Sequence, residues 1–201
     1  VPIGEWGIDH DHISRIIGRK TYWRNRAETT IALWNGKRDE VVESLKNDCA
    51  DFVEKLGYDI VTVELVPPKG YRVDDIPKQI EKGVWQDSKG NLYKYAASND
   101  SIMSMAHSPE KESFTDAEIQ KLTEDYSRID PTEFELVDFV CKKFGGQKAI
   151  LFRGPNFYEN VLSMFGSSQE HQLMMTVSNA DMIKKIGGIF LARASKLIRM
   201  C

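Results

Sequence analysis

The chain has 201 residues, of which 41% are hydrophobic, so it can bury a sizeable core as one domain. Its formal net charge of -3 provides no overall basic field, and no apolar stretch is long enough to cross a bilayer, so we expect neither nucleic acid nor a membrane as a partner. The three cysteines lack the Cys/His spacing of a metal site, which predicts reduced thiols in a cytoplasmic protein.

Three helices are predicted before any strand. Apolar residues recur with helical spacing from Asp9 to Gly18, from Tyr22 to Trp34 and from Arg38 to Leu56, and a glycine lies at or just past the end of each segment. Basic residues in this region alternate with acidic ones, which predicts a solvated face of mixed charge that includes Arg24, Arg26, Lys37 and Arg38.

The first predicted strand, Tyr58–Val66, is rich in β-branched residues and places Glu64 near its carboxyl end. Residues 67–83 are expected to be irregular. Val84–Tyr95 is predicted to form a β-hairpin around a polar turn, and residues 99–114 are expected to be loop.

The second half of the chain is predicted to be mainly helical. Thr115 and Glu118 have the spacing of a capping box, and Pro131 suits the first position of a helix that ends at Phe144. Cys141 lies in the apolar stripe of that helix, so we expect a buried thiol. Further helices are expected at residues 157–165, 169–177 and 179–200.

The candidate site lies in the stretch between Gly146 and Gly166. Ala149–Phe152 is a short apolar run, which predicts a strand covered on both faces. The residues that follow, Arg153, Gly154 and Asn156, break this pattern. A cation at the end of a buried strand, followed by a turn, is typical of the ligand pockets of α/β enzymes.

Two buried strands that are each followed by helices predict a parallel α/β fold. If the strands lie side by side and point the same way, Glu64 and Arg153 meet at one hollow. The chain begins at Val1 and stops at Cys201 without a capping glycine, so we expect both ends to be cuts in a longer polypeptide.

The segment LFRGPNFYENVLSMFG, residues 151–166, resembles the second-strand segment of the uroporphyrinogen decarboxylase superfamily. In that family a strand ending in Phe-x-Gly is followed by an aromatic residue and, a dozen residues after the first glycine, by another glycine. The matching residues are Phe152, Gly154, Phe157 and Gly166. Residues 18–70 are similar to a branch described as corrinoid-methyltransferase-like.

The resemblance implies a partial (β/α)₈ TIM barrel. Residues 1–57 would be its amino-terminal helical extension, and residues 58–201 would supply the first βα units, with a β-hairpin excursion after the first strand. The implied activity is corrinoid-linked methyl transfer, with a corrinoid protein as partner and zinc bound by residues beyond Cys201. The alternative is decarboxylation of uroporphyrinogen in porphyrin biosynthesis. Val1–Ile17 lacks the arginine-rich segment that holds porphyrinogen carboxylates, which favours the methyltransferase branch.

The resemblance also implies roles for individual residues. Glu64 stands near the place of the family's aspartate after the first strand, so it is expected to be a pocket acid; the alternative is a surface glutamate. Arg153 is expected to clamp an anionic group of the substrate, or else to pair with a structural acid such as Glu159. The remaining substrate-binding residues are expected to be Gly154, Asn156 and Phe157.

No metal site is expected in this chain. His10, Asp11 and His12 form a tempting cluster, but neighbouring side chains do not share one helix face, so a solvated arm is the preferred interpretation.

Two other interpretations stay open. The chain could be a non-catalytic domain that binds a tetrapyrrole or another anionic ligand. Alternatively, the isolated chain could be inactive and form oligomers through unpaired strand edges and apolar faces.

Overall fold

The computed structural model describes residues 1–5, 7–106, 108–154 and 156–200, without the side chain of Phe157. The chain forms two compact units. Unit 1 comprises Val1–Ala106 and Pro131–Arg153, and unit 2 comprises His107–Asp130 and Gly154–Cys201. The predicted boundary between residues 57 and 58 falls inside unit 1, and the assignment of residues 58–201 to a barrel stays a prediction.

Unit 1 begins with the three predicted helices, α1 (His10–Ile17), α2 (Arg26–Trp34) and α3 (Arg38–Leu56). Gly18 and Gly57 end α1 and α3 in the left-handed conformation. Helix α2 begins later than predicted because the side chain of Asn25 caps it by accepting a hydrogen bond from the backbone N–H of Glu28.

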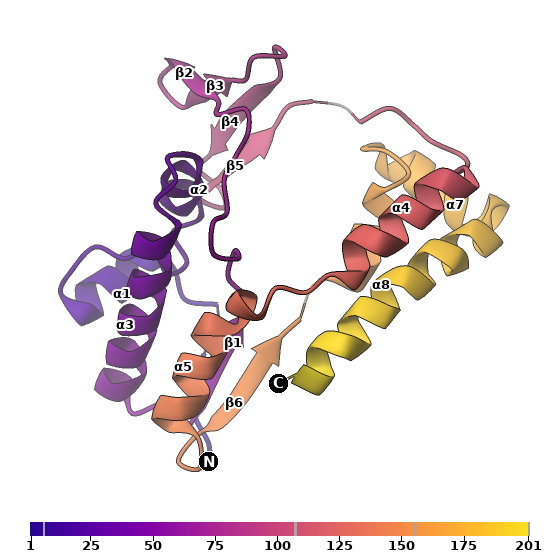
Figure 1. Cartoon of the computed structure of the whole chain (residues 1–201). Coiled ribbons are helices and arrows are strands. Elements are labelled where there is room, and N and C mark those ends of the chain that lie inside the picture. The colour runs from indigo at the N-terminus through magenta and orange to yellow at the C-terminus, as the bar shows by residue number, and fades with distance from the viewer. Residues whose placement is uncertain (6, 107, 155, 201) are drawn as a thin grey trace. The chain divides into compact units, whose positions relative to one another are not determined.

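A two-stranded parallel sheet follows, made of β1 (Ile60–Glu64) and β6 (Ala149–Arg153) (Figure 1). The 3-10 turn η1 (Pro131–Phe134) leads into helix α5 (Glu135–Phe144), which packs against both strands. The predicted parallel pairing is therefore confirmed. The prediction that residues 149–152 are covered on both faces is wrong: Ile150 and Phe152 are half-buried, whereas Leu151 on the opposite face is 55% exposed.

The second sheet of unit 1 is antiparallel, with strands in the order β2-β3-β4-β5. These strands are β2 (Lys78–Glu81), β3 (Val84–Gln86), β4 (Leu92–Ala96) and β5 (Ser101–Ser104). The β3–β4 hairpin was predicted. The outer strands, β2 and β5, lie in segments that were expected to be irregular. Neither strand buries alternate residues, so no alternation of apolar and polar residues marked them in the sequence.

Unit 2 contains four helices within the described residues: α4 (Asp116–Ser127), α6 (Phe157–Ser163), α7 (Gln169–Ser178) and α8 (Ala180–Met200). The predicted capping box of Thr115 and Glu118 is present at the start of α4. The buried core of unit 2 comprises Ile119, Val161, Phe165, Met175, Ile186 and Phe190. Gly166 has a φ of +118°, and a Cβ there would lie 3.0 Å from the backbone at Pro109 and Glu110, so another residue would strain this turn.

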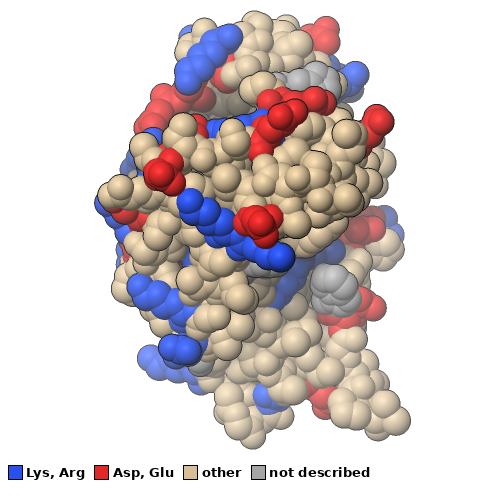
Figure 2. All heavy atoms as spheres, turned by 90° about the vertical axis from the view of Figure 1, so that its right-hand side faces the viewer, with Lys and Arg blue, Asp and Glu red and all other residues tan. Residues whose placement is uncertain are grey.

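Helices α7 and α8 also carry exposed apolar side chains. Leu173 and Val177 on α7 are 60% and 86% exposed, and Leu191 on α8 is 58% exposed. Figure 2 shows wide areas of surface without acidic or basic side chains. Within the described residues, we find no helix with the length and apolar character that a membrane crossing requires.

A buried arginine fixes the loops around the parallel sheet. The side chain of Arg38 is 3% exposed, so its assignment to a solvated face is wrong. Its guanidinium donates to the carbonyl of Pro67 at 2.7 Å and of Thr132 at 3.3 Å, and it contacts Glu135 Oε2 at 3.2 Å. Arg38 thus satisfies the carbonyl of Pro67 after β1 and that of Thr132 in η1, and it ties α3 to both ends of the connection between β1 and α5.

We expect Arg38→Ala to lower the free energy of unfolding by about 3–5 kcal/mol, because it leaves the carbonyls of Pro67 and Thr132 without this donor and removes one of the cations that hold the Glu135 carboxylate. The matched control is Lys37→Ala, which removes a neighbouring exposed cation paired with Glu40 and should cost less than about 1 kcal/mol. Denaturant unfolding measures both. Equal effects of the two substitutions would contradict the structural role of Arg38.

The two cysteines that the structure describes differ in their exposure to solvent. Cys49 is 1% exposed, and burial, followed by the nearby Asp48 carboxylate, raises the pKa of its thiol to about 12. Cys141 is exposed, so the expectation of a buried thiol there is wrong. Helix α5 turns Val137, Val140 and Phe144 to the core, and Cys141 lies beside this stripe.

In a Cys201→Ser background, we expect a small alkylating reagent to modify Cys141 in the folded protein and to modify Cys49 only after unfolding, since the thiolate is the reactive form. Peptide mass spectrometry with and without denaturant measures this difference. Native labelling of both cysteines at the same rate would contradict the buried position of Cys49.

Candidate functional site at the strand ends

The ends of β1 and β6 bring two of the predicted site residues together. Glu64 and Arg153 are partners in the strand register, and Arg153 Nη1 lies 3.8 Å from Glu64 Oε2. Their side chains are 56% and 45% exposed, so the pair contributes about 1 kcal/mol or less to stability. Arg153 thus has a carboxylate partner at the same strand ends. This partner is Glu64, whereas Glu159 was the example of a structural acid expected from the sequence.

A hollow of about 410 Å³ opens beside this pair, within the size range of small-molecule sites. Its lining includes the side chains of Glu64 and Arg153 together with two further arginines, Arg24 and Arg26. Three guanidinium groups against one carboxylate make the hollow net positive. Because guanidinium groups match carboxylate and phosphate geometry, the hollow suits an anionic ligand.

Arg24 and Arg26 are the two arginines of the hollow that the sequence did not indicate, and Arg24 is the more buried of them. Both were assigned to a solvated face, but Arg24 is half-buried, and its Nε donates to the carbonyl of Ile8 at 3.4 Å. Its backbone has a φ of +65°, an uncommon conformation for a residue with a long side chain. Such backbone strain is frequent at ligand-binding sites. No spacing in the sequence reveals a left-handed arginine, which explains why it was missed.

The segment around Arg24 is held in place from both sides. The backbone N–H of Tyr22 donates to Ser44 Oγ on α3, and its carbonyl accepts from Thr29 Oγ1 on α2. The ring of Trp23 packs edge-on against Phe52, with the ring centroids 5.3 Å apart. These contacts maintain the left-handed turn that aims Arg24 at the strand ends.

The other three predicted site residues belong to unit 2. Asn156 caps α6 by accepting a hydrogen bond from the backbone N–H of Glu159 at 3.4 Å. Gly154 is exposed, and the side chain of Phe157 lies outside the description. Their proposed contact with a substrate stays a prediction.

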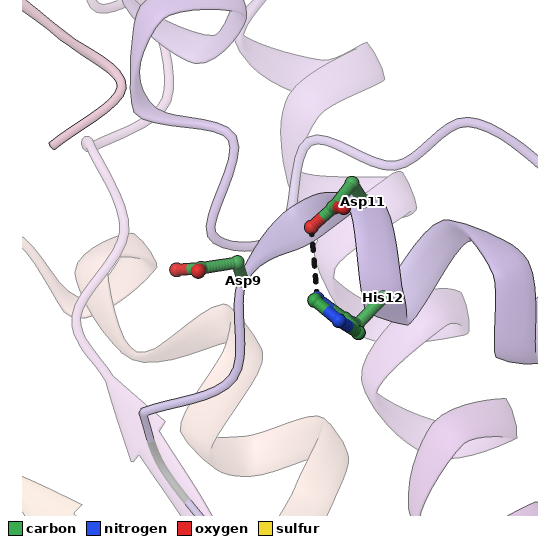
Figure 3. Close-up of side chains that lie close together, drawn as sticks. All are labelled: Asp9, Asp11 and His12. Carbon is green, nitrogen blue, oxygen red and sulfur yellow. Dashed lines mark hydrogen bonds and ion pairs between the residues drawn. The ribbon is translucent and has the colours of Figure 1, made fainter. Parts of the chain in front are cut away.

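The amino-terminal acidic and histidine residues lie near one another, mostly at exposed positions. Asp9, Asp11 and His12 place one potential ligand atom each within 4.8 Å of one another. Figure 3 shows Asp11 and His12 facing each other, joined by a contact of 3.0 Å between His12 Nδ1 and Asp11 Oδ1, with Asp9 to one side. His10 instead lies 3.3 Å from Asp100. The exposed position of these groups agrees with a solvated arm.

Comparison of the chain with protein-family models, with curated proteins and with solved structures finds no match.

Proposed function

We propose that β1 and β6 are the first two strands of a (β/α)₈ barrel of the uroporphyrinogen decarboxylase kind, and that this cytoplasmic enzyme works in corrinoid-linked methyl transfer. The observation that carries the proposal is the parallel pairing of β1 with β6, which sets Glu64 level with Arg153 beside a cationic hollow. Three helices before the first strand and a helix packed on both strands also fit the proposal. In barrels of this kind, the active site lies at the carboxyl ends of the strands.

The chemistry of the hollow supports binding of an anionic group. Arg153 would hold a carboxylate or phosphate of the substrate, and Arg24 and Arg26, which also line the hollow, would add to the positive charge. Glu64 would orient the Arg153 guanidinium and could donate or accept a proton at the bound group. Zinc and a corrinoid protein are the metal and the partner that the methyl-transfer proposal includes.

The three arginines of the hollow also favour a second candidate activity, the decarboxylation of a porphyrinogen. A substrate with several carboxylates needs several guanidinium groups, and the hollow presents three. A non-catalytic domain that binds a tetrapyrrole would use the same residues. Turnover distinguishes these alternatives: demethylation of methylcobalamin supports methyl transfer, release of carbon dioxide from uroporphyrinogen supports decarboxylation, and binding without either supports a carrier.

We expect Arg153→Ala to weaken binding of uroporphyrin, used as a polycarboxylate probe, by about tenfold or more, because a charge-assisted hydrogen bond contributes about 1.5–3 kcal/mol. Arg153→Lys should retain part of the affinity, since it keeps the charge but loses the planar fork. The control is Arg199→Ala, which removes the same charge from an exposed position at the end of α8. Calorimetric titration measures all three variants. Unchanged binding by a folded Arg153→Ala protein would refute the anion-clamp role.

The barrel proposal also predicts that the chain self-associates when studied alone, because the open face of the β1–β6 sheet carries the exposed side chain of Leu151. We expect Leu151→Glu to shift the protein towards the monomer in concentration-dependent size-exclusion chromatography. Leu173→Glu places the same charge on α7, where the side chain is also exposed, and should have the smaller effect. A chain that is monomeric at every concentration, or that responds only to Leu173→Glu, would contradict this prediction.

A further inference from the structure

A second hollow in unit 1 is larger than the one at the strand ends and is not used by the proposed function. Its volume is about 1110 Å³, and it lies between helices α1, α2 and α3 and one face of the antiparallel sheet. All of these elements belong to unit 1. Because small-molecule sites measure about 300–1,000 Å³, the hollow has room for a ligand of two or three rings.

The sheet supplies an aromatic wall with an amide beside it. Trp85 lies between Gln79 on β2 and Tyr93 on β4 in the strand register, so these three side chains project from the same face. Trp34 fixes the Trp85 ring by packing edge-on against it, at a centroid distance of 6.0 Å. Tyr95, two residues further along β4, projects from this face too, and it lines the hollow together with Trp85 and Gln79.

A glycine leaves the Tyr95 ring accessible. The backbone N–H of Tyr95 donates to the carbonyl of Gly83 at 2.8 Å, and Gly83 has a φ of +75°, where a side chain would strain the backbone. The Tyr95 side chain is 41% exposed. On the helical side, Ala27 and Ile31 lie one turn apart on α2 and also line the hollow. A ligand in the hollow therefore meets apolar surface from the sheet and from α2.

The charges of the lining nearly cancel. It contains three cations and four carboxylates, namely Arg19, Lys20, Lys82, Glu28, Glu40, Asp48 and Asp100. Three of the carboxylates already accept hydrogen bonds from side chains, since Arg19 donates to Asp48, Tyr22 to Glu40 and Tyr95 to Asp100. A ligand with a net charge of either sign would meet like charges in this lining. The hollow therefore favours a neutral ligand.

Polar side chains without a partner surround the apolar surface. Among the described residues, five lining groups have no hydrogen-bond or ion-pair partner: the amides of Asn47 and Gln79, the carboxylate of Glu28 and the ammonium groups of Lys20 and Lys82. They belong to five separate segments of unit 1, and they include both donors and acceptors. Scattered single donors and acceptors suit a ligand with several hydroxyl groups, because each hydroxyl both donates and accepts.

Tyr22 shows that Glu28 is an available acceptor. The Tyr22 hydroxyl donates to Glu40 Oε1 at 2.9 Å. Burial raises the pKa of this hydroxyl, followed by the hydrogen bond to Glu40 and the negative charges of Glu40 and Glu28. Glu28 thus lies near a hydroxyl that is already bound to another carboxylate, which leaves the oxygens of Glu28 for a ligand. Ile31 is three residues further along α2, on the same side of the helix.

We propose that this hollow binds a short neutral oligosaccharide of two or three hexose rings. One ring stacks on Tyr95 beside Trp85, and its hydroxyl groups exchange hydrogen bonds with Gln79 and Glu28. A sugar ring matches this lining because its faces carry C–H groups, whereas its edge carries hydroxyl groups. The site does not depend on the proposed methyl transfer.

Cellotriose is the probe, because its glucose rings carry equatorial substituents and therefore have flat faces. We expect saturable binding in calorimetric titration, with glucose at least tenfold weaker, since a single ring makes only part of the contacts. The affinity should change less than about twofold between roughly 50 mM and 500 mM salt, because a neutral ligand forms no ion pair. Spermidine tests the alternative of a cationic ligand. Saturable binding of spermidine without binding of cellotriose would overturn the proposal.

Two pairs of variants test the residues. Tyr95→Ala removes the stacking ring and should weaken cellotriose binding about tenfold or more, whereas Tyr95→Phe loses only the hydrogen bond to Asp100 and should bind within about twofold of the parent chain. Gln79→Ala should weaken binding about three- to tenfold. Gln86→Ala removes the same amide from the residue after Trp85, which projects from the opposite face, and should have no effect.

Circular dichroism establishes that each variant is folded, and if Tyr95→Ala does not fold, the two glutamine variants still decide the outcome. Equal effects of Gln79→Ala and Gln86→Ala would overturn the proposal, as would equal effects of folded Tyr95→Ala and Tyr95→Phe. Absence of saturable cellotriose binding by the folded parent chain would overturn it as well.

Discussion

The parallel pairing of β1 and β6 is the constraint on which the candidate site depends. The two strands are separated by the whole antiparallel sheet and by helices α4 and α5 in the sequence, yet their register places Glu64 opposite Arg153. A shift of one residue would turn one of the two side chains to the other face of the sheet. The position of the cationic hollow is therefore fixed by backbone hydrogen bonds, although the residues that line it come from distant parts of the chain.

Arg38 explains how this register is kept over such a long connection. An arginine in the first turn of a helix opposes the helix dipole, so its place at the start of α3 costs local stability. The cost is offset by tertiary contacts, because the guanidinium holds carbonyls after β1 and before α5. Although partial burial acts to raise it, the pKa of Glu135 is lowered overall by Arg38 and Lys46, so this network stabilises the fold above the carboxyl's ordinary pKa and weakens in acid.

The sequence predicted those parts of the fold that follow from local periodicity. The helical spacing of α3 gave its observed bounds, the capping box of α4 was identified from two residues, and the β-branched run before Pro67 gave β1. Elements that form through contacts between distant residues could not be predicted from the sequence. Strands β2 and β5 form because a hairpin offers them partners, and neither has a periodic pattern of its own.

The same distinction holds for the site. Glu64 and Arg153 could be located because each ends a recognisable strand, whose carboxyl ends meet at one edge of a parallel sheet. Arg24 and Arg38 could not be distinguished in sequence from exposed basic residues beside acidic ones. Their roles are set by a left-handed backbone in one case and by unsatisfied carbonyls in the other. The aromatic face of Trp85 and Tyr95 likewise depends on strand register.

The short turn that carries Arg24 has a consequence for how the two hollows communicate. Tyr22 and Asn25 line both the hollow at the strand ends and the larger hollow of about 1110 Å³ between helices α1–α3 and the antiparallel sheet, so this one segment separates the two. If a ligand on one side shifts this segment, the affinity on the other side changes, and thermodynamic linkage requires the effect to be equal in both directions. Arg24, whose φ of +65° is uncommon for a residue with a long side chain, lies within this segment.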